Sequence, residues 1–301
     1  MDVRARANLG LVSSIPFIKG HGTENDFVLL PDPDASLDLT PARVRALCDR
    51  RAGIGADGVL RVVRAKAIED RPSSVDTVDT VDPVDDDRWF MDYRNADGSV
   101  AEMCGNGARL FARYLHDTGL VSGAEFTIGT RGGAKAVHVA DDGISVAMGV
   151  PRVVGTSTAT LGTATLPGTA VDVGNPHLVC EVDQVLGLDL TTPPGYDATV
   201  FPDGVNVEFV EVETTDRLRM RVHERGVGET RSCGTGTVAT VAAVLHARGA
   251  TAGAATVFVP GGRVRVVITE DGATLTGPAV FVAAGELDKT WWQALDQGIA
   301  E

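Results

Sequence analysis

The sequence is poor in cysteine and in basic residues. Four cysteines in 301 residues are too few for a disulfide scaffold, and none forms the Cys-x-x-Cys pair typical of structural zinc sites. We therefore expect reduced thiols and no bound metal. Lys and Arg number 27 against 41 Asp and Glu, a net charge of −14. Nucleic acids and anionic membranes require clustered basic residues, so neither is expected as a partner.

Long hydrophobic runs are also missing. No run approaches the roughly 18 apolar residues of a membrane helix. The apolar stretch at residues 9–16 is short and has no clear cleavage signal. We expect a cytoplasmic protein that has no membrane partner.

Hydrophobic residues make up 44% of the chain, aromatic residues only 5%, and there are 35 glycines. This composition favours a compact α+β fold with many tight turns. A chain of 301 residues exceeds the size at which one core usually stops growing. We predict one domain over residues 1–149 and a second over 150–277, with residues 278–301 packed back on the first.

A short phrase occurs twice, as Cys104-Gly-Asn-Gly and as Cys233-Gly-Thr-Gly. Apolar periodicity predicts a helix over residues 105–115 after the first phrase and over 237–247 after the second. Each cysteine would then stand at a helix N-terminus. Free N–H groups and the helix dipole at such a terminus lower a thiol pKa and bind a carboxylate.

Two facing thiols suit a reaction that removes a proton from one face of a carbon and returns one to the other face. Negative charge flows into the neighbouring carboxylate as the α-proton leaves, and preorganised N–H donors stabilise it there. The expected donors are the first residues of the two helices: Gly105, Asn106, Gly234 and Thr235. The pattern indicates a racemase or epimerase acting on a small acid with an α-hydrogen.

Several asparagines stand near predicted turns. Asn25 lies at the mouth of a predicted hairpin, Asn95 and Asn175 lie in turns, and Asn206 lies within a strand pattern. Asn is also an ordinary turn residue, because it tolerates the left-handed conformation. From the residues alone, both interpretations remain open.

The chain resembles the diaminopimelate epimerase family. The resemblance is carried by several phrases in the family's order: Gly22-Thr-Glu-Asn-Asp-Phe27, Gly53-Ile-Gly-Ala-Asp-Gly58, Asn95-Ala-Asp-Gly-Ser99, Cys104-Gly-Asn-Gly-Ala-Arg109, Gly174-Asn-Pro-His177, Gly204-Val-Asn206, Glu224-Arg-Gly-Val-Gly-Glu-Thr230 and Cys233-Gly-Thr-Gly236. It implies an isomerase that interconverts LL- and meso-2,6-diaminopimelate in lysine and peptidoglycan-precursor biosynthesis, without a cofactor. It also implies a homodimer and two pseudo-symmetric domains, each a curved, mostly antiparallel sheet around a central helix, with the active site in the cleft between them.

The resemblance assigns roles to individual residues. Cys104 is the expected proton donor and Cys233 the proton acceptor in the LL-to-meso direction. His177 and Glu224 are expected to tune the thiol pKa values. A distal amine and carboxylate also need an acceptor such as Glu224 and a guanidinium such as Arg225. The residues expected to contact substrate are Asn25, Asn95, Gly105, Asn106, Asn175, Asn206, Glu224, Arg225, Gly234 and Thr235.

Three alternatives remain. A proline racemase or hydroxyproline epimerase uses similar loops, although Asn106 and the Glu224-Arg225 pair argue against a substrate that lacks distal charges. A catalytically silent amino-acid-binding relative and a thiol protease are weaker, because both cysteines are present and neither has a convincing catalytic histidine. His177 itself follows a proline in a turn, where a surface histidine is equally consistent. Residues 65–88, rich in Asp, Val and Pro, are expected to form a solvated loop.

Overall fold

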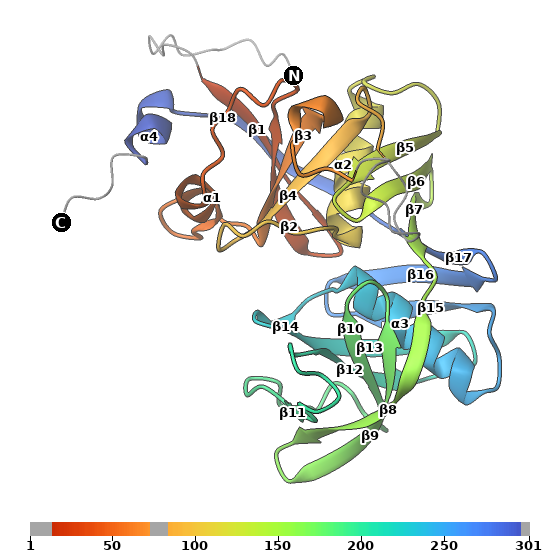
Figure 1. The fold of residues 1–301 in the computed structure, drawn as a ribbon. Coiled ribbons are helices and arrows are strands. Elements are labelled where there is room, and N and C mark those ends of the chain that lie inside the picture. Colours follow the sequence, from red (N-terminus) through yellow and green to blue (C-terminus); the bar gives the residue numbers. More distant parts are fainter. Residues whose placement is uncertain (1–13, 73–83, 296–301) are drawn as a thin grey trace, which may run out of the picture.

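The computed structural model describes residues 14–72 and 84–295. Figure 1 shows them folded into two lobes joined at one side. One long helix lies among the strands of each lobe, α2 (Gly105–Asp117) in the first and α3 (Gly234–Ala247) in the second. The expected strand-rich α+β class is confirmed, and both helices begin directly after the repeated cysteines.

Most strands of the first lobe pair antiparallel. Only β2 with β3 and β4 with β5 are parallel. The C-terminal strand returns to this lobe, because β18 pairs with β1 and places Leu287 opposite Ile15. In spatial order the strands are β18 (Val280–Leu287), β1 (Ile15–Gly22), β2 (Asn25–Pro31), β3 (Gly58–Arg64), β4 (Trp89–Asn95), β5 (Glu125–Thr130), β6 (Gly133–Ala140) and β7 (Gly143–Gly149).

The central strands of this lobe are buried on both faces. In β2, Phe27 and Leu29 belong to the core around α2, whereas Val28 and Leu30 pack with α1 (Pro41–Cys48). This division follows from the two-residue period of a strand, and it explains the continuous apolar run. The N-cap of α1 is Thr40, whose side chain accepts a hydrogen bond from the backbone N of Arg43. The short α4 (Lys289–Ala294) adds to the same outer core.

The second lobe surrounds α3, an Ala- and Val-rich helix that is buried on nearly every side. Among its strands, β10 with β12 and β13 with β15 are parallel, and the other pairs are antiparallel. The strands are β8 (Arg152–Leu161), β9 (Ala164–Asp172), β10 (Pro176–Glu181), β11 (Gly195–Tyr196), β12 (Asn206–Val212), β13 (Arg217–Glu224), β14 (Gly228–Thr230), β15 (Gly253–Val259), β16 (Gly262–Thr269) and β17 (Gly272–Gly277).

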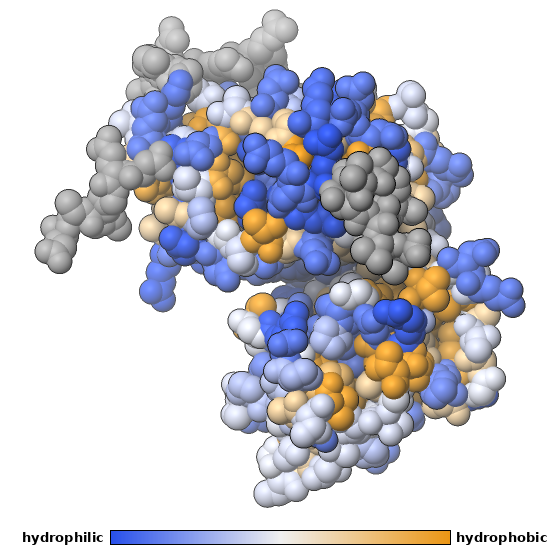
Figure 2. All heavy atoms as spheres, in the orientation of Figure 1, coloured by the Kyte–Doolittle hydropathy of each residue, from blue (hydrophilic) through white to orange (hydrophobic). Residues whose placement is uncertain are grey.

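The lobes are joined through β17, which pairs with β16 on one side and with β7 on the other. Leu275 of β17 and Met148 of β7 lie against Gly105, the first residue of α2. The junction of the lobes therefore lies at the start of that helix. Figure 2 shows the surface hollowed between the two lobes in the same orientation.

The prediction of a solvated loop over residues 65–88 is wrong at both ends of the segment. Residues Ala65–Ala67 form a short 3₁₀ helix, η1. Ile68 and Val84 are buried and pack with Phe90 of β4. Residues 73–83 of this segment lie outside the described residues, as does the chain before residue 14. Within the described ranges, no helix is long and apolar enough to cross a membrane.

Candidate active site

Both repeated cysteines are the N-cap residues of their helices. Cys104 precedes α2 and Cys233 precedes α3, each with an extended backbone. The side chain of Cys104 is half-buried, and that of Cys233 is buried. The Cys233 sulfur accepts a hydrogen bond from the backbone N of Gly236 at 3.4 Å, and its Sγ lies 3.5 Å from Thr235 Oγ1. Each thiol thus lies where the unpaired N–H groups of a helix begin.

The starts of the two helices meet. A Cβ atom added to Gly234 would lie 3.2 Å from the Cα of Gly105, so the backbones approach closely because neither residue has a side chain. Asn106 bridges the same contact, since its Nδ2 donates to the backbone oxygen of Ser232 at 3.1 Å. The fold therefore brings the expected donors Gly105, Asn106, Gly234 and Thr235 to one place.

Asn25 lies on the first-lobe side of this contact. Its Oδ1 accepts hydrogen bonds from the Cys104 thiol at 3.5 Å and from Asn106 Nδ2 at 3.2 Å. Its Nδ2 donates to the Asp57 carboxylate at 2.8 Å, and Asp57 in turn pairs with Arg50. A carboxylate accepts only, so Asp57 fixes the orientation of the Asn25 amide and directs its oxygen toward the thiol.

Asn95 is not tied to the thiols by a hydrogen bond. It ends β4, and its Nδ2 donates to Ser99 Oγ at 3.0 Å within a turn. This contact is typical of an ordinary turn asparagine. The amide is still half-exposed, so it can accept another partner.

Asn175, His177 and Asn206 form a second group on β10, β12 and the turn before β10. His177 Nε2 lies 2.9 Å from Asn175 Oδ1. Asn206 donates to the backbone oxygen of Pro176 at 3.1 Å and accepts from the backbone N of Arg225 at 3.0 Å. Asn206 therefore fixes the backbone at the end of β13, where Glu224 and Arg225 stand.

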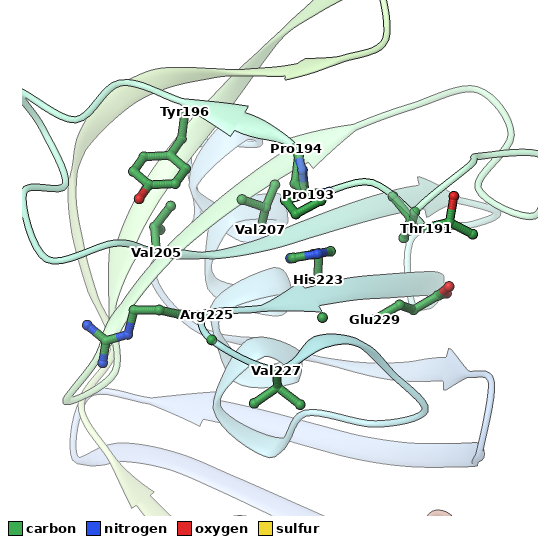
Figure 3. Close-up of a pocket in the computed structure, with 13 residues that line it drawn as sticks. Thr191, Pro193, Pro194, Tyr196, Val205, Val207, His223, Arg225, Val227 and Glu229 are labelled. Atoms are coloured by element: carbon green, nitrogen blue, oxygen red, sulfur yellow. The ribbon is translucent and has the colours of Figure 1, made fainter.

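The Arg225 side chain is directed away from this group. It is exposed, and its Nη1 donates to the backbone oxygen of Asp203 at 3.1 Å. Arg225 lines a surface pocket of about 590 Å³ together with Tyr196, His223 and Val227. Figure 3 shows its guanidinium at the edge of that pocket, pointing away from His223. Neither thiol lines the pocket, so the structure does not bring Arg225 and the thiols together.

Burial dominates the electrostatics of the thiols. Burial raises the pKa of Cys104 to about 11. The Glu224 carboxylate also raises this pKa, whereas the N–H groups of Gly107 and Asn106 and the charge of Arg109 lower it. Burial also raises the pKa of Cys233 well above its usual value, and the carboxylates of Glu224 and Glu208 raise it further. Burial raises the pKa of Glu224 as well. Both thiols are therefore protonated in most molecules at neutral pH.

His177 is fully buried, so its interpretation as a surface histidine is wrong. Its Nδ1 lies 2.7 Å from Oε1 of Glu208, a buried carboxylate on β12 that the sequence analysis overlooked. The same oxygen lies against the first turn of α3, because a Cβ on Gly236 would be 2.3 Å from it. A signal was present: Glu208 stands between Val207 and Phe209 in a strand pattern, where a charge has no partner nearby in sequence.

Arg109 was also overlooked as a site residue. It lies one turn into α2 and its side chain is fully buried, with a hydrogen bond from Nη2 to Asn106 Oδ1 at 2.8 Å. In the sequence it stands among the apolar residues of the predicted helix. An arginine at such a position indicates a buried charge. In the described part of the chain, no group of three His, Cys, Asp or Glu side chains is arranged to hold a metal ion.

Comparison with known proteins decides the family. The family model for diaminopimelate epimerase matches residues 17–154 and 169–282. The chain belongs to the diaminopimelate epimerase family. Diaminopimelate epimerases are isomerases, and two curated members show the degree of similarity. The Rhodococcus opacus protein is 53% identical over 290 residues, covering 93% of this chain and 99% of its own length. The Corynebacterium glutamicum protein is 53% identical over 283 residues, covering 91% and 98%.

Solved structures share the fold of the diaminopimelate epimerase family at low identity. A Bacillus anthracis phenazine biosynthesis protein of the PhzF family superposes with a TM-score of 0.62 at 16% identity, covering 92% of this chain and 99% of its own. A hydroxyproline epimerase from Agrobacterium vitis gives a TM-score of 0.62 at 15% identity, covering 91% and 93%. These likenesses concern the fold alone.

Proposed function

We propose that this protein interconverts LL- and meso-2,6-diaminopimelate by a two-thiol, cofactor-independent mechanism, in the cytoplasm and in lysine and peptidoglycan-precursor biosynthesis. The contact between Gly105 and Gly234 is the observation that carries the proposal. It joins two helix N-termini, each capped by a cysteine, at the junction of the lobes. Family membership supports the choice of substrate.

In the LL-to-meso direction, Cys233 as thiolate removes the α-proton and Cys104 as thiol delivers a proton to the opposite face. The C–H bond breaks toward the Cys233 sulfur, and its electron pair is shared with the neighbouring carboxylate. N–H groups of Gly105, Asn106, Gly234 and Thr235 hold that carboxylate, where they act most strongly in the transition state. In the reverse direction the two thiols exchange roles.

Asparagines on both sides of the helix contact orient the rest of the substrate. We assign Asn25 and Asn95 to the first-lobe side and Asn175 and Asn206 to the second. An amide can donate to a carboxylate and accept from an ammonium, so it gives direction without adding charge. The fixed amide of Asn25 also accepts from the Cys104 thiol, which holds that sulfur in one orientation.

Glu224 and Arg225 serve the distal ammonium and carboxylate of the substrate. Arg225 must leave the backbone oxygen of Asp203 to do so. The Arg225 side chain is exposed, so it can change rotamer while its backbone N stays bonded to Asn206.

His177 tunes Cys233 together with Glu224. A carboxylate beside the thiol destabilises the thiolate, and both Glu224 and Glu208 act on Cys233 in this way. His177 opposes them, because it holds Glu208 in a hydrogen bond and places a basic ring beside that carboxylate.

We also propose two domains, residues 1–149 with 278–301 and residues 150–277, and a homodimer. The pairing of β18 with β1 supports assigning the C-terminal segment to the first domain. The continuous ladder from β7 to β17 supports a short, stiff connection between the domains.

Solvent-deuterium exchange with two substrates tests this function. Given LL-diaminopimelate in deuterated water, the purified, reduced protein should form meso-diaminopimelate with deuterium at the inverted α-carbon, and it should put no deuterium into proline. Exchange into proline alone would assign the protein to the proline racemase type. Binding of diaminopimelate without exchange into either compound would indicate a silent amino-acid-binding relative.

A further inference from the structure

Arg109 is a buried charge without a charged partner. Its side chain is fully inaccessible, and all of its hydrogen bonds go to neutral oxygens. No carboxylate in the described part of the chain pairs with it, and the ionisable group that acts on it is Cys104. The acceptors are the backbone oxygens of Pro278 and Gly105 and the side-chain oxygens of Thr23 and Asn106.

Such a charge is costly to bury, because its hydration is lost and no opposite charge replaces it. Burial lowers the pKa of Arg109 to about 10, which still leaves the group protonated at neutral pH. The cost of burying the Arg109 charge falls when a negative charge forms close to it. The candidates in this site are the thiolate of Cys104 and a substrate carboxylate at the helix starts.

The hydrogen bonds of Arg109 also fix an amide. Asn106 Oδ1 accepts from Arg109 Nη2 at 2.8 Å, so its Nδ2 must face the other way. That nitrogen donates to Asn25 Oδ1 at 3.2 Å and to the backbone oxygen of Ser232 at 3.1 Å. Arg109, with the Thr23 hydroxyl that donates to the same oxygen at 3.2 Å, therefore orients the amide that contacts both half-sites, including the asparagine that accepts from Cys104.

We propose that Arg109 is a positioning residue of the proton-transfer site: it orients the Asn106 amide and supplies the buried positive charge that balances the Cys104 thiolate and the reacting carboxylate. This inference rests on the proposed function for its catalytic consequence. Its electrostatic consequence concerns Cys104 alone and needs no substrate.

Arg113 offers a matched control. It lies one turn further along α2 and donates to the backbone oxygen of Ala279, as Arg109 does to that of Pro278. Arg113 differs in being partly exposed and paired with Asp117, and it touches neither asparagine. Loss of each arginine removes one tie between α2 and the start of β18, so a general structural effect should appear in both.

Turnover of reduced protein tests the positioning role. Arg109→Gln should lower kcat about 100-fold, as expected when a reacting group is misplaced by about an ångström, with a smaller change in KM. Arg109→Lys keeps the charge but loses the planar set of guanidinium donors, so we expect kcat to fall about 10-fold. Arg113→Gln and Arg113→Lys should stay within about twofold of wild type. Wild-type kcat in folded Arg109→Lys would overturn the positioning role.

The pH dependence of iodoacetamide modification at Cys104, followed by peptide mass mapping, tests the charge. The groups that face Cys104 are Arg109 on its own helix, Glu224 of β13 and Tyr93 of β4. Removing this positive charge should disfavour the thiolate, so Arg109→Gln should move the midpoint of Cys104 modification to higher pH. Arg109→Lys and the Arg113 variants should keep the wild-type midpoint. An unchanged midpoint in Arg109→Gln overturns the electrostatic role.

The turnover assay and the Cys104 modification assay together distinguish failure of the proposed function from failure of the inference about Arg109. If the wild type shows no exchange into diaminopimelate, the proposed function fails, while the modification midpoint still decides the role of Arg109. If Arg109→Gln does not fold, Arg109→Lys decides through its kcat. If the wild type is active and both Arg109 variants behave like the Arg113 controls, the inference alone is wrong.

Discussion

Gly234 and Gly105 touch across the junction of the lobes, with only 3.2 Å between the Cα of Gly105 and the position of a Cβ on Gly234. Real Cβ contacts are rarely this short, so a side chain at Gly234 must push the two helix starts apart. This contact sets the distance between the two sets of N–H donors and between the thiols that precede them. Activity should therefore depend on it more than stability does.

Gly234→Ala tests that contact. Alanine favours a helix over glycine by about 1 kcal/mol, which offsets the cost of crowding Gly105 and Leu275, so stability should change little. Displaced donors and thiols should lower kcat by at least about 10-fold. Gly187→Ala is the control, because no atom lies within 4 Å of its added Cβ. Thermal unfolding and initial rates distinguish the outcomes, and equal rates in the two variants would show that the contact is unimportant.

Replacing either site cysteine should abolish epimerisation. Cys104→Ala and Cys233→Ala each remove one of the two proton-transfer groups, and such groups typically contribute 10²–10⁴-fold. We expect less than about 1% of wild-type turnover in both. Cys48→Ala is the control, since Cys48 is buried in the outer core of the first lobe. Full turnover in either site variant would refute the two-thiol scheme.

Oxidation should inactivate the protein reversibly. Two thiols that converge on one carbon can form a disulfide, and added thiol reduces it again. We expect activity to fall without reductant and to return with dithiothreitol, and peptide mapping to find Cys104 joined to Cys233. Cys48 and Cys180 should remain free, because each is packed in a different hydrophobic cluster, one in each lobe. An oxidised sample in which Cys104 and Cys233 are never joined would show that they do not face each other.

The pH profile should respond to Glu208. Proton abstraction needs a thiolate, and burial raises the pKa of both thiols, so turnover should rise with pH from neutral to alkaline. The Glu208 carboxylate raises the pKa of Cys233, so Glu208→Gln should shift the acid limb to lower pH. Glu211→Gln, on the same strand, should leave it unchanged. A shift to higher pH would mean that Glu208 acts mainly by holding His177. Because the two thiols interact, the apparent pKa values of the profile describe the pair and not either cysteine alone.

The sequence predicted the elements whose signals are local. Glycines after each cysteine and the apolar periodicity located the two helices α2 and α3. The long hairpin of β8 and β9 was largely missed. Few positions of either strand are buried, so they lack the alternation of apolar and polar residues that identifies a half-buried strand.

Site residues next to a helix start could be predicted from the sequence. Those whose position depends on partners distant in sequence could not. Cys104, Cys233 and the first helical residues could be named from the repeated phrase. The burial of Arg109 depends on Thr23 and Pro278, and that of Glu208 on His177. These partners lie far away in sequence, so only the folded chain shows that both charges adjoin the helix starts.

The most direct test of the two-thiol account is the position of deuterium at early times in deuterated water. A thiol holds a single hydrogen, so the thiolate that removes the α-hydrogen can return only that hydrogen to the same face. The account therefore predicts deuterium in newly formed meso-diaminopimelate and none in the recovered LL-diaminopimelate at low conversion. Deuterium appearing equally early in the recovered substrate would indicate one base that exchanges with solvent, and would contradict the account.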